Sequence, residues 1–188
     1  MELIEPVCSD PVIANLWHPV SAIDEIHRGL LNKTLLLDEE IGFTVTPGGE
    51  YRSWRLPPSS ASGQAVDPEE ISDPLPVKSE YGYLWVCLGE PPERLFDMPE
   101  FDDPDRRSMN AGTVTVATSA PRGVENFLDL GHFPYVHEGN LGIEPFTEVV
   151  EYEVEIVDGE IIASKCDFFV PKAGTNFDKP ALTRYRYR

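Results

Sequence analysis

The alternating segment "FTEVVEYEVEIVDGEIIASKCDFFV", residues 146–170, constrains the fold of this chain more than any other stretch. Apolar and polar residues alternate on both sides of Asp158-Gly159, which is the period of a β-strand with two different faces. Asp-Gly between two such runs favours a tight turn, because both residues tolerate the positive φ angles that the turn requires. The segment therefore predicts an antiparallel hairpin.

Three other stretches are typical of β structure. The Pro-Gly-Gly sequence at 47–49 lies between alternating runs and predicts a second hairpin. "YGYLWVCLG", residues 81–89, is rich in aromatic and β-branched side chains, and "TRYRYR" at 183–188 alternates with period 2. We therefore expect several short antiparallel strands in both halves of the chain.

The second half opens on a different pattern. "AGTVTVATSA" predicts a strand over about 111–118. A helix is expected to follow over about 120–133, with Ser119 near its N-cap and Pro121 in its first turn, where a missing N–H does no harm. Strands together with this helix predict the α+β fold class.

Length and composition suggest two small domains. The chain has 188 residues, enough for one ordinary domain or two small ones. The acidic, proline-containing stretch at 91–107 is typical of a boundary. We therefore expect a β domain over 1–110 and a second domain over 111–188.

Charge and hydropathy exclude several classes of protein. The formal net charge of −18 opposes binding to nucleic acid, because no basic face offsets phosphate repulsion. No run approaches the roughly 18 apolar residues of a membrane span, and the N-terminus lacks the features of a secretory signal. Three widely spaced cysteines suit free thiols in a reducing compartment. We therefore expect a cytoplasmic protein with no membrane partner.

The stretch "NFLDLGHFPYVHEG", residues 126–139, contains the candidate site. On the expected helix, Glu125, Asp129 and His132 are spaced i, i+4 and i+7 and share one face. Pro134 should end or kink the helix, so that His137 can turn back toward His132. Two converging imidazoles make half of a metal site.

The spacing alone does not select the metal. Imidazole binds Fe, Zn, Cu or Ni, and two histidines with one carboxylate form the facial arrangement of non-heme Fe(II) oxygenases. Asp129 is placed to accept the second N–H of His132, or to face outward as an electron or proton conduit. The alternatives are a chance pair of ordinary packed histidines and a zinc-binding or hydrolytic site.

"ENFLDLGHFPYVH" resembles the mononuclear-iron motif E-x3-D-x2-H-x4-H of the Rieske non-heme iron oxygenases, which hydroxylate aromatic rings or remove methyl groups. Three further stretches resemble that family, namely "NLWHPVSAIDEI", "SEYGYLWVCLGEPP" and "GNLGIEPFTEVVEYEVEI". The resemblance implies a Rieske-like β domain followed by a helix-grip (START-like) catalytic domain. It also implies Fe(II) on His132 and His137, with Asp129 as the conduit, Glu125 in the motif and Asn126 as a polar group near the metal.

Two departures from the family pattern limit this expectation. A Rieske cluster needs C-x-H and C-x2-H pairs, and none of the three cysteines has a histidine at either spacing, so this chain cannot hold its own [2Fe-2S] cluster. The family's third iron ligand is an Asp on a helix far downstream. Here Asp158, Asp167 and Asp178 lie in turn, strand and loop sequence, and no third carboxylate ligand is found. We therefore expect a partial catalytic domain: another chain completes it, the iron site is incomplete, or the sequence is a fragment.

The resemblance implies a Rieske-deficient subunit of a hetero-oligomeric oxygenase. A Rieske-bearing oxygenase or reductase partner would supply electrons, as in bacterial N-demethylase systems that include those acting on methylxanthines. The expected reaction is the O2-dependent hydroxylation of a small aromatic or N-methyl substrate, or its oxidative N- or O-demethylation. The alternative is a non-catalytic structural subunit that stabilises an active oxygenase partner.

Overall fold

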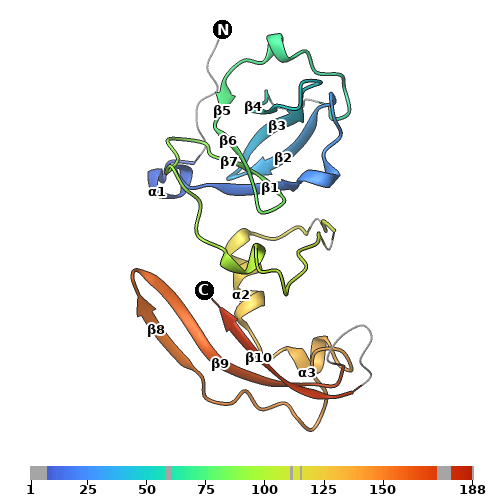
Figure 1. Cartoon of the computed structure of the whole chain (residues 1–188), viewed down its shortest axis with the longest axis vertical. Helices are drawn as coiled ribbons and strands as arrows, with labels where there is room; N and C mark the ends of the chain where they lie inside the picture. Colours follow the sequence, from blue (N-terminus) through green and yellow to red (C-terminus); the bar gives the residue numbers. More distant parts are fainter. Residues whose placement is uncertain (1–7, 58–60, 111, 115, 173–178, 188) are drawn as a thin grey trace. The chain divides into compact units, whose positions relative to one another are not determined.

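The computed structural model describes residues 8–57, 61–110, 112–114, 116–172 and 179–187. The chain divides into two compact units, Met1–Val114 and Thr115–Arg188. Most of the regular structure is antiparallel strand, with few helices (Figure 1). Within the described ranges, no helix combines the length and apolar character needed to span a membrane.

Unit 1 contains two small antiparallel sheets. One has the strand order β2-β3-β4-β5 and the other β1-β7-β6. The predicted turn at 47–49 is confirmed, because Val45 of β3 pairs with Tyr51 of β4 on either side of it. The elements of unit 1 are α1 (Pro11–Ala14), β1 (His18–Ala22), η1 (Ile23–Glu25), β2 (Asn32–Leu36), β3 (Glu39–Val45), β4 (Tyr51–Arg55), η2 (Pro68–Glu70), β5 (Pro74–Leu75), β6 (Val77–Glu80), β7 (Tyr83–Val86) and η3 (Pro99–Phe101).

The two sheets of unit 1 share an apolar core. β3 buries almost every residue, and β7 buries Leu84, Trp85 and Val86, as its aromatic and β-branched sequence predicts. Val86 packs with Ile41 of β3, which joins the two sheets through side chains. The transfer of these side chains out of water is the main force that holds the unit together.

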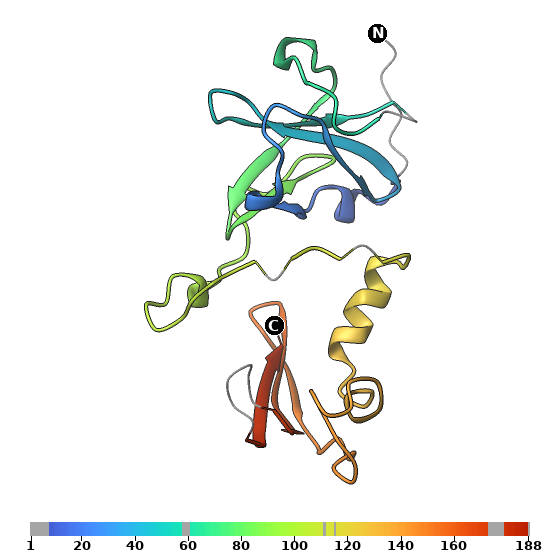
Figure 2. The ribbon, with the colours of Figure 1, turned by 90° about the vertical axis from the view of Figure 1, so that its right-hand side faces the viewer.

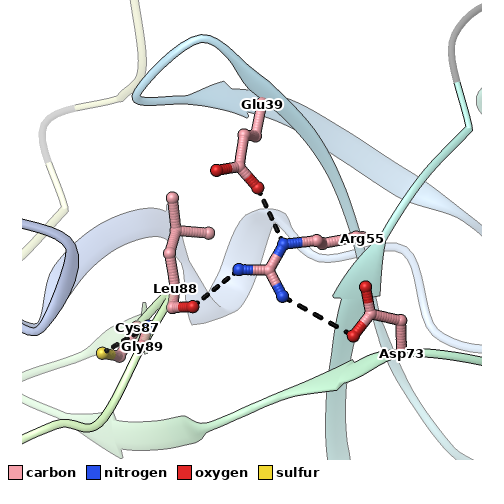
Figure 3. A network of polar contacts seen from close by, with 6 residues as sticks. All are labelled: Glu39, Arg55, Asp73, Cys87, Leu88 and Gly89. Atoms are coloured by element: carbon pink, nitrogen blue, oxygen red, sulfur yellow. Dashed lines mark hydrogen bonds and ion pairs between the residues drawn. The ribbon is translucent and has the colours of Figure 1, made fainter. Parts of the chain in front are cut away.

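A polar network around Arg55 joins four segments of unit 1 (Figure 3). The Arg55 guanidinium donates to the Glu39 carboxylate at 2.8 Å and to the carbonyl oxygen of Leu88 at 2.6 Å, and it lies 3.5 Å from a carboxylate oxygen of Asp73. Both side chains of the Arg55–Glu39 pair are nearly buried. The network links β3, β4, the turn before β5 and the end of β7.

Unit 2 is a three-stranded antiparallel sheet with two helices. Its elements are α2 (Ala120–Leu128), α3 (Phe133–Val136), β8 (Glu153–Val157), β9 (Glu160–Val170) and β10 (Ala181–Tyr187), and its strand order is β10-β9-β8. The predicted hairpin is confirmed: Val157 pairs with Glu160, and Asp158 and Gly159 both have positive φ. The predicted strand at 183–188 lies within β10, although Arg188 is outside the described residues.

One face of the unit 2 sheet packs against the segment that contains α3. Leu130 and Phe133 form a buried cluster with Cys166 and Phe168 of β9. The aromatic rings of Phe133 and Phe168 meet edge to face, with centroids 5.7 Å apart. Figure 2 shows α2 leading into this segment beside the three strands.

The strand expected over 111–118 is wrong. The described residues 112–114 and 116–118 form no strand, while Ala111 and Thr115 lie outside the described residues. Val114 and Val116 are 84% and 69% exposed. Alternation alone does not make a strand, because a strand also needs a neighbour that accepts and donates its backbone hydrogen bonds.

The helix expected over 120–133 is also wrong in its second half. α2 ends at Leu128, and Asp129 follows in extended conformation as the C-cap. The Asp129 side chain accepts a hydrogen bond from the backbone N–H of Gly131 at 2.8 Å. This local bond competes with helical hydrogen bonding, so the chain turns at Asp129 and begins a new helix at Phe133.

Candidate metal centre

Short-range helix geometry brings His132 and His137 together. His132 is the N-cap of α3 and His137 is its C-cap, so one helical turn separates them. Pro134 lies in the first turn of α3, where it needs no hydrogen-bond partner, and does not end the helix as the sequence predicted. The two imidazole centroids are 5.2 Å apart, with an angle of 62° between the ring planes.

This separation is compatible with a shared metal ion, as it is with an ordinary edge-to-face pair of rings. A metal–nitrogen bond of about 2.1 Å places a ring centroid roughly 3.3 Å from the metal. Two such rings on one metal, at an angle between roughly 90° and 110°, have centroids about 4.7 to 5.4 Å apart. The 5.2 Å between His132 and His137 lies inside that range.

Asp129 contacts His132 and Gly131 at the same time. One carboxylate oxygen lies 3.2 Å from Nδ1 of His132, and the other accepts the Gly131 N–H. A carboxylate at Nδ1 holds the proton on that nitrogen and leaves Nε2 unprotonated as a metal ligand. The Asp129 side chain is 54% exposed, whereas that of His132 is 14% exposed.

Apolar and aromatic side chains lie beneath the two histidines. The Phe133 ring meets His132 edge to face at 5.0 Å and contacts Tyr185 at 5.9 Å between centroids. Burial raises the pKa of the Tyr185 hydroxyl, and burial followed by the nearby Asp167 charge raises that of the Cys166 thiol. Both groups therefore stay neutral near neutral pH and add no charge beneath the site.

The other predicted site residues lie elsewhere on the surface of unit 2. The Glu125 carboxylate pairs with Arg122 at 2.8 Å, and both side chains are exposed. Asn126 is exposed on α2. Because the helix ends at Leu128, the expected face shared by Glu125, Asp129 and His132 does not form, and a turn brings Asp129 to His132 instead.

The structure gives no third carboxylate ligand among the residues it describes. No group of three or more His, Cys, Asp or Glu side chains in the described ranges could hold a metal ion. Asp167 forms two hydrogen bonds with Arg184, which hold the pKa of that carboxyl below its usual range. Asp158 is in the hairpin turn, and Asp178 lies outside the described residues.

Sequence reasoning missed the segment that follows His137. The backbone turns sharply after His137, whose carbonyl oxygen accepts from the N–H groups of Asn140 and Leu141. Gly142 is buried and lies against the peptide between Phe133 and Pro134. The only signal in the sequence is the pair of glycines in "EGNLG", which indicates a turn but not its contact with the site.

Solved oxygenase structures share the fold of this chain. Dicamba monooxygenase bound to dicamba matches with a TM-score of 0.67 and 21% identity, over 94% of this chain and 64% of that one. At this identity the likeness shows the fold alone. No protein-family model matches the chain.

The sequence relatives of this chain are methylxanthine demethylases. The chain is similar to them over most of its own length. It is 39% identical to a probable methylxanthine N7-demethylase, NdmC, of Pseudomonas sp. (strain TJI-51), over 92% of this chain and 57% of that protein. It is also 24% identical to the methylxanthine N3-demethylase NdmB of Pseudomonas putida, over 85% of this chain and 58% of that protein. The chain therefore spans less than three fifths of these curated relatives.

Proposed function

We propose that this chain contributes the mononuclear iron site of a multicomponent oxygenase that removes N-methyl groups by O2-dependent hydroxylation. Unit 1 is then a Rieske-like domain without cluster ligands, and unit 2 is part of a helix-grip catalytic domain. The observation that carries the proposal is the pair of imidazoles 5.2 Å apart with Asp129 on Nδ1 of His132. The 39% identity to a probable methylxanthine N7-demethylase supports an N-methyl substrate.

The overall reaction needs electrons that this chain cannot store. An N-methyl group, O2, two electrons and two protons give the N–H product, formaldehyde and water. The sequence has no Rieske ligand pair, so a [2Fe-2S] cluster on a partner chain supplies the electrons. Fe(II) bound by the two imidazoles would supply the activation of O2.

The residues of this chain perform the supporting steps. Asp129 would fix the His132 tautomer through Nδ1 and, being half exposed, would relay protons or lie on the path of electrons that come from the partner. Phe133 packs edge-on against His132 and limits its rotation. The buried aromatic cluster beneath it keeps water from one side of the site.

The test is iron content and turnover in the assembled system. The chain is purified with a Rieske-bearing partner and a reductase, then assayed for iron per chain and for O2-dependent release of formaldehyde from N-methylated xanthines. We expect His132→Ala to abolish both signals. The matched control is His27→Ala in unit 1, where His27 is exposed and lies outside the site; this variant should keep both signals.

A second function is a non-catalytic subunit that stabilises an active oxygenase partner. It is favoured by the absence, among the described residues, of a third group that completes a metal site. If the complex carries no iron on this chain and formaldehyde release survives His132→Ala, this second function stands and the catalytic proposal fails.

A further inference from the structure

The segment after His137 folds back onto the turn that contains the two histidines. We call residues 138–146 the return loop. The N–H of Gly139 donates to the carbonyl oxygen of Gly142 at 2.8 Å, and Glu138 forms an isolated bridge with Gly142. The loop is closed a second time by the bridge between Ile143 and Phe146.

Gly142 makes the closest approach between the return loop and α3. A Cβ atom at Gly142 would lie 2.7 Å from the nitrogen of Pro134, 2.8 Å from its Cα and 2.9 Å from the carbonyl carbon of Phe133. All three are backbone atoms, so no side-chain rotation relieves the contact. Any larger residue at 142 must move the loop or the first turn of α3 by about half an ångström.

The return loop and α3 together determine where His137 lies. Its N–H donates to the carbonyl oxygen of Phe133 at 3.1 Å, and its carbonyl oxygen accepts from Asn140 and Leu141 at 3.0 Å each. His137 is therefore bonded to α3 on one side and to the return loop on the other. Gly142 in turn contacts the peptide between Phe133 and Pro134, which lies one residue after His132. The return loop therefore touches the backbone beside both histidines.

We infer that Gly142 is a positioning residue that sets the separation of the His132 and His137 imidazoles and so determines the metal affinity of the site. This inference rests on the proposed metal site. A functional site is held productively only within roughly half an ångström, which is the size of the displacement that a Cβ at 142 requires. Groups that hydrogen-bond to metal ligands change metal affinity by about 10- to 100-fold when they are altered, and we expect a backbone displacement beside the two histidines to act in the same range.

The experiment measures Co(II) affinity and the visible absorption spectrum of bound Co(II) in the full chain. We expect Gly142→Ala to weaken Co(II) binding by about tenfold or more and to change the spectrum. The matched control is Gly123→Ala in α2, because a Cβ there would meet nothing within 4 Å. It should bind Co(II) as the wild type does. Circular dichroism and thermal unfolding show whether each variant is folded.

A second variant addresses a folding defect in Gly142→Ala. One glycine inserted between Gly139 and Asn140 lengthens the return loop without adding a Cβ at 142. Weaker binding by this folded variant supports the inference. Binding within threefold of wild type, in either folded variant, overturns it. If the wild type and His132→Ala bind Co(II) equally, the proposed metal site itself fails. Equal binding by the wild type and Gly142→Ala, with weaker binding by His132→Ala, overturns only the role of Gly142.

Discussion

At the scale of single residues, Asp129 combines a contact that the sequence predicted with a turn that it did not. Its one carboxylate oxygen ends α2 by accepting the Gly131 N–H, and its other oxygen contacts Nδ1 of His132. The same side chain therefore shapes the turn and contacts the His132 imidazole. A substitution that removes both carboxylate oxygens would also remove the hydrogen bond from the Gly131 N–H and so disturb the turn. The contact with His132 is therefore best tested by replacing one oxygen only.

Asp129→Asn should weaken metal binding while preserving the fold. The asparagine Oδ1 still accepts the Gly131 N–H, but its amide NH2 cannot accept a hydrogen bond from Nδ1–H of His132. The imidazole proton then favours Nε2, which blocks the metal-binding nitrogen. We expect Co(II) affinity to fall by about 10- to 100-fold, and long-range proton–nitrogen NMR should show the changed tautomer of His132.

The control for this change is Asp158→Asn, which removes the same charge from the hairpin turn of unit 2. Asparagine tolerates the positive φ of 52° at that position. Co(II) binding should therefore be unchanged. Equal affinity of wild type and Asp129→Asn, with an unchanged His132 tautomer, would show that Asp129 serves only the turn.

At the scale of elements, local signals predicted structure well where one turn determined the result. The sequence predicted both hairpins correctly, one at Asp158-Gly159 and one at the glycines 48 and 49. At both places the turn residues and the alternation of the flanking strands indicate the same structure. The expected helix failed after Leu128 because a single side-chain hydrogen bond from Gly131 to Asp129 outweighs helix periodicity. The approach of Gly142 to Pro134 was beyond prediction, since sequence spacing does not show which backbone segments touch.

The Arg55 network offers a stability prediction at this scale. Arg55→Met removes the guanidinium that pairs with the buried Glu39 carboxylate, and it removes a donor from the Leu88 carbonyl oxygen. We expect the free energy of unfolding of unit 1 to fall by about 3 to 5 kcal/mol. Urea unfolding followed by tryptophan fluorescence measures this directly, because Trp17, Trp54 and Trp85 all belong to unit 1.

An exposed arginine on the same strand provides the comparison. Arg52 pairs with Glu50, and both side chains are more than half exposed, so Arg52→Met should cost about 0 to 1 kcal/mol. The double variant Glu39→Gln, Arg55→Met should recover part of the loss by removing the buried negative charge. Equal stability losses for Arg55→Met and Arg52→Met would contradict a structural role for the buried network.

At the scale of the whole molecule, unit 2 has many apolar side chains that its own residues do not cover. Val124, Phe127 and Leu128 of α2 are all more than half exposed, as are Val154 and Ile156 of β8. The chain also spans less than three fifths of its curated relatives. The sequence motif could identify two imidazoles and their carboxylate, but it does not show what covers these apolar side chains.

The net charge of −18 leads to a prediction about the partner that the proposed function requires. Opposite charges steer two proteins together from a distance, and salt screens that attraction because the Debye length falls from about 10 Å at 0.1 M to about 3 Å at 1 M. If a basic face of the partner recognises this acidic surface, the association rate measured by stopped flow should fall at least tenfold between about 0.05 and 0.5 M NaCl. The dissociation rate should change far less, because contacts at the interface itself are poorly screened.

Sucrose at matched osmolarity is the control and should leave both rates unchanged. An association rate that is independent of salt would mean that the acidic surface serves solvation alone, and that partner recognition depends on the exposed apolar side chains of unit 2 instead.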